Sequence, residues 1–117
     1  MVKIENSKGT IRISEEVFTN IAGDAASGCF GVKGMAGRNR ESGLYRLLSR
    51  ESMSKGVFVT FNEDDTATIA VHIVVDHGVN LAAVGASIIS EVSYKVNQAT
   101  GVPVKRVDVF VDSMTVD

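Results

Sequence analysis

The feature that most constrains this chain is a helical pattern in residues 76–102, DHGVNLAAVGASIISEVSYKVNQATGV. Apolar residues recur there at spacings of three and four, which places them on one face of a helix. Asn80 is placed to cap the first turn and Gly101 to end the helix, and Pro103 prevents its continuation. The pattern predicts a helix of about 20 residues, roughly 30 Å long. The apolar stripe consists of Leu81, Val84, Ile88, Val92, Val96 and Ala99.

Gly85 lies on the apolar face of this predicted helix. A glycine inside a helix is about 1 kcal/mol less favourable than an alanine. We therefore expect a compensating close approach of another backbone at Gly85, where a bulky side chain would overpack the core.

A shorter helical pattern follows a strand near the N-terminus. Residues 10–13 alternate polar and apolar side chains and predict the strand. Ser14 is placed to cap the helix, Glu15 and Glu16 occupy its positively polarised first turn, and Gly28 is placed to end it. The apolar face of this helix is expected to contain Val17, Phe18, Ile21, Ala22, Ala25 and Cys29.

Four further segments have the patterns of strands. Residues 30–37, FGVKGMAG, predict a strand whose glycines admit a bulge or tight packing. Residues 57–61 and 69–75 alternate and predict an antiparallel hairpin, joined through the polar turn NEDD at 62–65. Residues 107–112 alternate in the same way and predict a last strand.

The segment between these strands, residues 38–55, has a different character. Its sequence, RNRESGLYRLLSRESMSK, is charged, and Leu44, Leu47 and Leu48 recur at helical spacing. The spacing predicts a short helix within a long charged connection.

Together these elements predict an α+β fold. Strands with one apolar face and helices with one apolar stripe pack most economically as a two-layer sandwich. We expect two main helices on one face of a four- to five-stranded mixed sheet. A length of 117 residues without linker or repeat predicts one domain over residues 1–117.

Composition bears on the compartment. The single cysteine excludes a disulfide within the chain and fits a reducing environment. The N-terminal residues lack the apolar run of a signal peptide, and no stretch approaches the length of a membrane span. We expect a cytoplasmic protein that becomes peripheral to the membrane only through a partner.

Residues capable of catalysis or metal binding are few. Cys29 lies on an apolar face without a histidine beside it, and we expect a buried, inert thiol. In a strand, His72 and Asp76 point to one face and His77 to the other, and the spacing of a metal site is missing. The acidic run at 63–65 lacks the glycine and distal glutamate of a calcium loop. We predict no enzyme activity, no catalytic residue, no metal and no cofactor.

Residues 31–34, GVKG, have the G-x-x-G form that some domains use to clamp a nucleic-acid backbone. That clamp needs a helix on each side, whereas the residues after GVKG have a strand pattern. A small nucleic-acid-binding module that uses the GVKG loop and the basic segment 33–55 is the alternative function. The chain has two tyrosines and no tryptophan, which weighs against stacking on bases.

Charge is unevenly distributed along the chain. Residues 33–55 hold six basic and two acidic residues, a net charge of +4, whereas the rest hold six basic and twelve acidic, a net charge of -6. The segment is either a solvated loop or a docking patch for an acidic partner or an anionic surface. We predict partner binding at Lys33, Arg38, Arg40, Arg46, Arg50 and Lys55.

Two blocks of sequence resemble a known family. IRISEEVFTNIAGDAASGCFGVKGMAG, and DHGVNLAAVGASIISEVSYKVNQATGVPVKRVDVFV further on, are similar to the alkaline-shock-protein (Gls-type) family of Gram-positive bacteria. GLYRLLSRESMSKGVFV resembles its short, single-domain branch, often encoded beside a dihydroxyacetone-kinase-like fatty acid kinase. The resemblance implies a non-enzymatic cytoplasmic protein linked to cell-envelope stress, and some members are held at the membrane by a partner.

The residues and the resemblance together favour a small interaction or scaffold protein in envelope stress or homeostasis. We expect a protein partner, either membrane-associated or a fatty acid kinase-like neighbour. We expect no nucleic acid and no direct membrane span, and the sequence leaves a homo-oligomer open.

Overall fold

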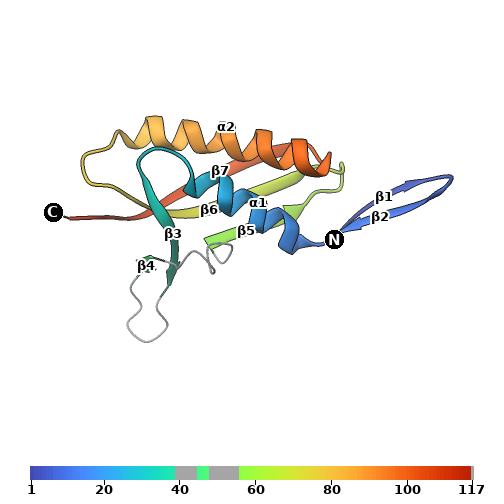
Figure 1. Cartoon of the computed structure of the whole chain (residues 1–117), viewed down its shortest axis with the longest axis horizontal. Helices are drawn as coiled ribbons and strands as arrows, with labels where there is room; N and C mark the ends of the chain where they lie inside the picture. Colours follow the sequence, from blue (N-terminus) through green and yellow to red (C-terminus); the bar gives the residue numbers. More distant parts are fainter. Residues whose placement is uncertain (39–44, 48–55, 117) are drawn as a thin grey trace.

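The computed structural model describes residues 1–38, 45–47 and 56–116. Within them the chain forms two helices, a five-stranded sheet and a separate two-stranded sheet (Figure 1). The elements in order are β1 (Val2–Asn6), β2 (Gly9–Ile13), α1 (Glu15–Ser27), β3 (Val32–Arg38), β4 (Tyr45–Leu47), β5 (Val57–Phe61), β6 (Ala67–Val75), α2 (Leu81–Thr100) and β7 (Val104–Met114).

Helix α2 has the boundaries that its sequence predicts. The Asn80 side chain accepts a hydrogen bond from the Ala83 backbone N–H at 3.0 Å. Gly101 adopts the left-handed conformation with φ 78°, and its N–H donates to the Asn97 carbonyl. The helix between them has 20 residues, which confirms the predicted length.

The buried stripe of α2 differs from the prediction at both ends. Val84, Ile88, Val92 and Val96 are buried as expected, but Leu81 and Ala99 are exposed. Thr100 is buried instead, because its hydroxyl donates to the Val96 carbonyl at 2.7 Å and accepts from the Val102 N–H at 3.1 Å. A hydroxyl paired in this way can leave water.

The predicted close approach at Gly85 is wrong. Gly85 is only half-buried, and a Cβ added there would meet nothing within 4 Å. The glycine lies beside the buried stripe, next to open space rather than next to another backbone.

Helix α1 follows Ser14, which occupies the N-cap position without making a side-chain capping bond, and it ends at Gly28. Val17, predicted on the apolar face, is exposed. Phe18 is buried and packs edge-to-face on Phe61, with ring centroids 5.0 Å apart. The other buried residues of α1 are small and let α2 pack closely; they are Ala22, Gly23 and Ala26.

Strand β6 is the centre of the main sheet. It pairs in parallel with β7 along one edge. Along the other edge it pairs antiparallel with β5 in its first half and with β3 in its second half. The β3 pairing contains a register shift between Val32 and Gly34, which agrees with the expectation that the glycines of this strand admit a bulge or tight packing. The mixed five-stranded sheet confirms the predicted fold class.

Gly56 occupies the point where β3 leaves β6 and β5 begins. A Cβ there would lie 2.9 Å from the Ala36 carbonyl oxygen and 3.1 Å from the His72 carbonyl oxygen. Only glycine fits between these two backbones without displacing them.

The helix predicted around Leu44, Leu47 and Leu48 is wrong for the described residues. Tyr45–Leu47 form the strand β4, which pairs antiparallel with the part of β3 beyond its contact with β6. The β3 backbone there no longer pairs with β6, and β4 satisfies its hydrogen bonds instead. Leu44 and Leu48 lie outside the described residues.

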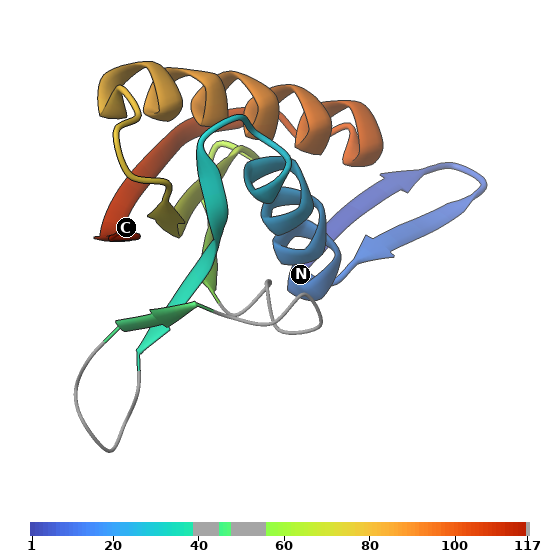
Figure 2. The same ribbon diagram turned by 60° about the vertical axis from the view of Figure 1, so that its left-hand side comes forward.

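The strand predicted at residues 10–13 is confirmed as β2, but it does not join the main sheet. It pairs with β1, an element that the sequence pattern did not predict, in a hairpin that projects from the body (Figures 1 and 2).

The core lies between the main sheet and both helices, which cover the same face (Figure 2). Ile69, Val71, Ile73 and Val75 of β6 are fully buried there. The structure thus has the predicted two layers, and neither helix of the described residues covers the other face of the sheet.

Candidate docking surface on the open face of the sheet

The open face carries the alternate residues of β5, β6 and β7. Register pairs Phe58 with Ala70 and Ala70 with Asp108, and it pairs His72 with Phe110. Since directly opposed residues share a face and their neighbours in each strand point to the core, these side chains point away from the helices.

Three rings form a cluster on this face. The His72 ring stacks on Phe110, with centroids 4.6 Å apart and planes 9° from parallel. Phe58 meets the same imidazole edge-on at 5.6 Å. Phe58 is 60% exposed and Phe110 46% exposed, so the cluster presents apolar surface to solvent.

Asp112 holds the imidazole in place. Its Oδ2 lies 2.8 Å from His72 Nδ1, and both side chains are largely buried. A carboxylate only accepts, so this contact places the proton of a neutral imidazole on Nδ1. The bond orients the ring plane against Phe110 and leaves Nε2 as the ring nitrogen that does not contact Asp112.

Charges border the ring cluster. Arg106 Nε donates to Asp108 Oδ1 at 2.8 Å on the same face. An apolar centre with a polar border has the composition of a protein-docking site. We call Phe58, His72 and Phe110, with Asp112, the aromatic surface.

The alternation of residues 69–75 predicts His72 on the face opposite the apolar side chains, and the structure confirms this, since Val71 and Ile73 are buried and His72 lies on the other face. The same pattern suggested Asp76 as the neighbouring carboxylate, whereas the structure pairs His72 with Asp112, 40 positions away. Only the alternation of Phe110 and Asp112 in the last strand hinted at this partnership.

The structure describes part of the predicted basic site. Lys33 is exposed on β3. Arg38 and Arg46 lie on paired strands, opposite Tyr45 and Gly37 respectively, so their backbones are neighbours. Arg40, Arg50 and Lys55 lie outside the described residues. Partner binding by this segment stays a prediction.

The GVKG loop lacks the surroundings of a nucleic-acid clamp. Helix α1 precedes it, but Val32, Lys33 and Gly34 belong to β3. Gly31 has φ +88°, and a Cβ there would lie 2.9 Å from Val84 Cγ2, so this glycine serves packing against α2.

The remaining candidates have structural contacts. Cys29 is buried as predicted, and its thiol donates to the Ala25 carbonyl at 3.4 Å. His77 is exposed, and its backbone N–H donates to Thr115 Oγ1 at 3.1 Å. Neither contact assembles a nucleophile with a base.

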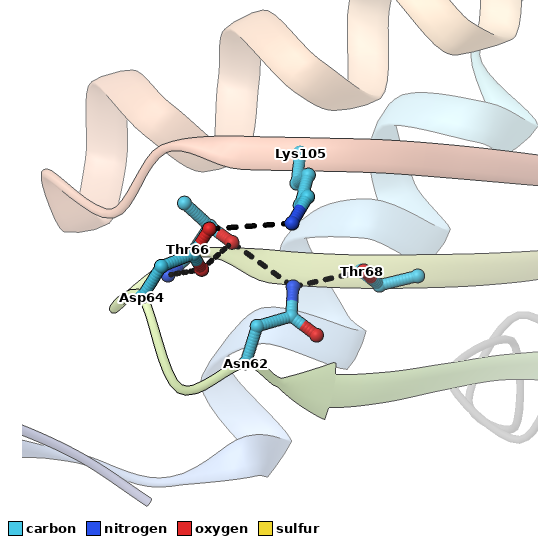
Figure 3. A network of polar contacts seen from close by, with 5 residues as sticks. All are labelled: Asn62, Asp64, Thr66, Thr68 and Lys105. Atoms are coloured by element: carbon cyan, nitrogen blue, oxygen red, sulfur yellow. Dashed lines mark hydrogen bonds and ion pairs between the residues drawn. The ribbon is translucent and has the colours of Figure 1, made fainter.

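The acidic turn is tied to its neighbours by hydrogen bonds (Figure 3). Asp64 accepts from the Thr66 hydroxyl at 2.5 Å and from Lys105 Nζ at 3.3 Å. Asn62 Nδ2 donates to Thr66 Oγ1 at 2.9 Å and to Thr68 Oγ1 at 3.0 Å. The hydrogen bond from Thr66, followed by Lys105, lowers the pKa of Asp64 below its ordinary value of 3.8. The predicted polar turn is therefore a link between the β5–β6 hairpin and β7.

Membrane-spanning and metal-binding features are absent from the described part of the chain. No helix in residues 1–38, 45–47 and 56–116 is long and apolar enough to cross a membrane. Among the same residues, no three His, Cys, Asp or Glu side chains gather as metal ligands would.

These features define a small α+β protein whose sheet is covered by helices on one face and open on the other. Residues 3–116 match the ASP23 family, cell envelope-related function, so the chain belongs to this alkaline-shock-type family. The resemblance to the alkaline-shock-protein family is thereby confirmed, and the link to a fatty acid kinase stays a prediction.

The relatives are proteins of similar length. The chain is 34% identical over 116 residues to the uncharacterized protein YloU of Bacillus subtilis, covering 98% of this chain and 96% of YloU. It is 30% identical over 116 residues to the uncharacterized protein Spy1614 of Streptococcus pyogenes, covering 98% and 95%. The uncharacterized protein YqhY of Bacillus subtilis is 31% identical over 109 residues, covering 93% and 79%. No solved structure matches the chain.

Proposed function

We propose that this protein is a non-enzymatic interaction protein that serves the cell envelope by binding a protein partner in the cytoplasm. Membership of an envelope-related family supports the process. The observation that carries the binding role is the aromatic surface, where Phe58 and Phe110 stay exposed around an oriented imidazole. Exposed apolar groups gathered within a polar border mark interaction sites.

The chemistry of the surface describes the partner. Phe58 and Phe110 offer apolar area for an aliphatic or aromatic side chain, and His72 Nε2 offers one polar contact. The basic segment 33–55 adds an electrostatic contact, because its net charge of +4 attracts an acidic partner. The partner is therefore a protein with an apolar patch next to acidic residues, and a membrane-bound protein or a fatty acid kinase-like protein would qualify.

The test compares phenylalanines inside and outside the aromatic surface. A photo-crosslinking residue at Thr60, exposed on the same face, should attach to one defined protein in host cells. Phe58→Ala with Phe110→Ala should abolish that crosslink. Phe30→Ala removes an equally large side chain that is 91% exposed elsewhere, and it should leave the crosslink intact. A crosslink that survives the double substitution would refute the role of this surface.

The basic segment has its own experiment. Reversal of Arg38, Arg40, Arg46 and Arg50 to glutamate should preserve folding, since exposed charges each contribute less than about 1 kcal/mol. Capture of the crosslinked partner should fall, and capture by the wild type should weaken with added salt. Equal capture by the reversed protein would make this segment a solvated connection.

A nucleic-acid-binding role is the second candidate, because exposed phenylalanines on a sheet can stack on bases. Asp108 and Asp112 on the same face oppose it by repelling phosphates. Fluorescence anisotropy with single-stranded oligonucleotides separates the two functions. We expect no binding at moderate salt, and binding that is lost in the Phe58→Ala, Phe110→Ala variant would favour this alternative.

A further inference from the structure

The N-terminal hairpin stands apart from the body of the molecule. Strands β1 and β2 pair with each other, and within the described residues neither pairs with the main sheet. Figures 1 and 2 show the hairpin projecting beyond α1. An isolated two-stranded ribbon is marginally stable in water, and its free edges are templates for another strand.

The register divides the hairpin side chains into two faces. Val2 opposes Ile13 and Ile4 opposes Ile11, which forms an apolar face. Ile4 is 38% exposed and Ile11 is 55% exposed. The charged face contains Lys3, Glu5, Thr10 and Arg12.

The charged face contains a conflict. Lys3 directly opposes Arg12 across the hairpin, an arrangement of like charges that destabilises a strand pair. Glu5 lies on the same strand, with its Oε1 3.5 Å from Lys3 Nζ, and its own cross-strand neighbour is Thr10. Across the hairpin Lys3 therefore faces a cation, and the carboxylate that pairs with it comes from its own strand.

A hollow of about 580 Å³ adjoins β1. Val2 and Ile4 line it from the hairpin, and Phe61, Val102 and Pro103 line it from the body. A second strand laid against the base of β1 would enter this hollow and meet these apolar side chains, together with the polar side chains of Lys3, Asn62 and Asp65.

We infer that β1 pairs antiparallel with the β1 strand of a second copy, across a two-fold axis at Ile4. This register sets Lys3 of each copy opposite Glu5 of the other, and Val2 opposite Asn6. Each Lys3 then has Arg12 on one side and a carboxylate on the other, which relieves the like-charge pair. On the apolar face, Ile11 and Ile4 of one copy continue into Ile4 and Ile11 of the second.

The alternation of hydrogen-bonded and non-hydrogen-bonded pairs in the hairpin agrees with this register. Asn6 and Gly9 close a two-residue loop, and such a closing pair is hydrogen-bonded. Since bonded and non-bonded pairs alternate, Lys3 and Glu5 direct their N–H and C=O groups toward the free edge. These are the residues that the two-fold register joins, so each can exchange both hydrogen bonds with its partner.

Charge selects β1 over the other free edge. Pairing of β2 with itself about Ile11 would set Thr10 against Arg12 and leave Lys3 and Arg12 without a carboxylate. The hollow also adjoins β1, whereas no β2 residue lines it. The occupant that matches both observations is a second β1 strand.

Charge reversal tests the register. Sedimentation equilibrium of the wild type should give about 25 kDa, twice the 12.5 kDa of one chain. Lys3→Glu sets two carboxylates against each other across the axis, and Glu5→Lys sets two ammonium groups against each other. Each single reversal should therefore shift the mass toward the monomer. The double reversal restores opposite charges across the axis and should restore the dimer.

Proline substitution supplies a matched control. Glu5→Pro removes an N–H from the β1 edge and should give a monomer, whereas Thr10→Pro removes one from the β2 edge and should leave the dimer. Circular dichroism verifies that each variant is folded. A monomeric wild type, or a dimer that persists in both Lys3→Glu and Glu5→Lys, would overturn the inference. Because Phe58 and Phe110 lie away from β1, failure here leaves the proposed partner binding standing.

Discussion

The two faces of the main sheet differ in what covers them. On one face Ile69, Val71 and Ile73 are fully buried beneath the helices. On the other face Phe58 and Phe110 flank His72 and remain exposed. Successive residues of one strand thus have different surroundings: one set is buried and supplies folding energy, and the other lies on the face where Phe58 and Phe110 remain exposed.

The two sheet faces differ because both helices place their buried stripes on the same face. Each helix has one buried stripe, and both stripes pack on the same sheet face. The structure therefore predicts that substitutions under the helices reduce stability strongly, and substitutions on the aromatic surface reduce it weakly.

The largest effect is expected in the covered core. Ile88→Ala removes a fully buried side chain of α2 and should lower the free energy of unfolding by about 2–5 kcal/mol. Ile89→Ala is the matched control, because its side chain is the next one along the helix and is exposed. Guanidinium unfolding measures both. Similar losses in the two variants would contradict the assignment of the buried face.

A smaller effect is expected on the aromatic surface. Phe110→Ala removes a ring stacked on His72 and should lower the free energy of unfolding by about 1 kcal/mol, the scale of an aromatic pair. The same guanidinium titration compares it with Ile88→Ala. A loss as large as that of Ile88→Ala would mean that Phe110 belongs to the core and is not free for a partner.

Local signals made much of the covered layer predictable. Asn80 and Gly101 cap α2 through bonds within four residues, so neighbouring sequence determines them. The alternation of 69–75 identified the buried face of β6 correctly. These features need no knowledge of what lies opposite them.

The arrangement of side chains on the open face could not be predicted in the same way, because it depends on pairings between strands that are distant in the sequence. The register shifts between Ile73, which pairs with Val111, and Val74, which pairs with Ser113, so Asp112 lies at the shift, and its carboxylate contacts the His72 imidazole. The strand β4 forms because β3 leaves β6 after Met35, which no periodicity in 38–55 records. Alternation reveals which residues share a face, but not which strand lies beside them.

Substitution of Gly85 should stabilise the protein, in contrast to the destabilising substitutions Ile88→Ala and Phe110→Ala. A Cβ there meets open space, so Gly85→Ala should raise the free energy of unfolding by about 0.5–1 kcal/mol through helix propensity. Gly31→Ala is the control, because its positive φ and the 2.9 Å approach to Val84 Cγ2 make it destabilising. Thermal melts measure both. A lower melting temperature for Gly85→Ala would contradict the open space beside Gly85 and support the close backbone approach that the sequence predicted.

The smallest effect on stability is expected at the exposed turn that joins β5 to β6, which belongs to neither face of the sheet. The pKa of Asp64 lies below its ordinary value of 3.8, chiefly because Thr66 donates to the carboxylate and secondarily because Lys105 does. The folded state then binds a proton less tightly than the unfolded chain. The resulting stabilisation is present above pH 3.8 and disappears as the pH falls through the lowered pKa.

Asp64→Asn should therefore lower the melting temperature slightly at neutral pH, and the difference from wild type should vanish in acid. Thr66→Val should reproduce most of that pH-dependent difference, because Thr66 is the main cause of the lowered pKa, and Lys105→Met should reproduce a smaller part. Added salt should diminish the Lys105 contribution, since both partners are exposed. A difference between Asp64→Asn and wild type that stays constant down to strong acid would show that the carboxylate charge does not stabilise this turn.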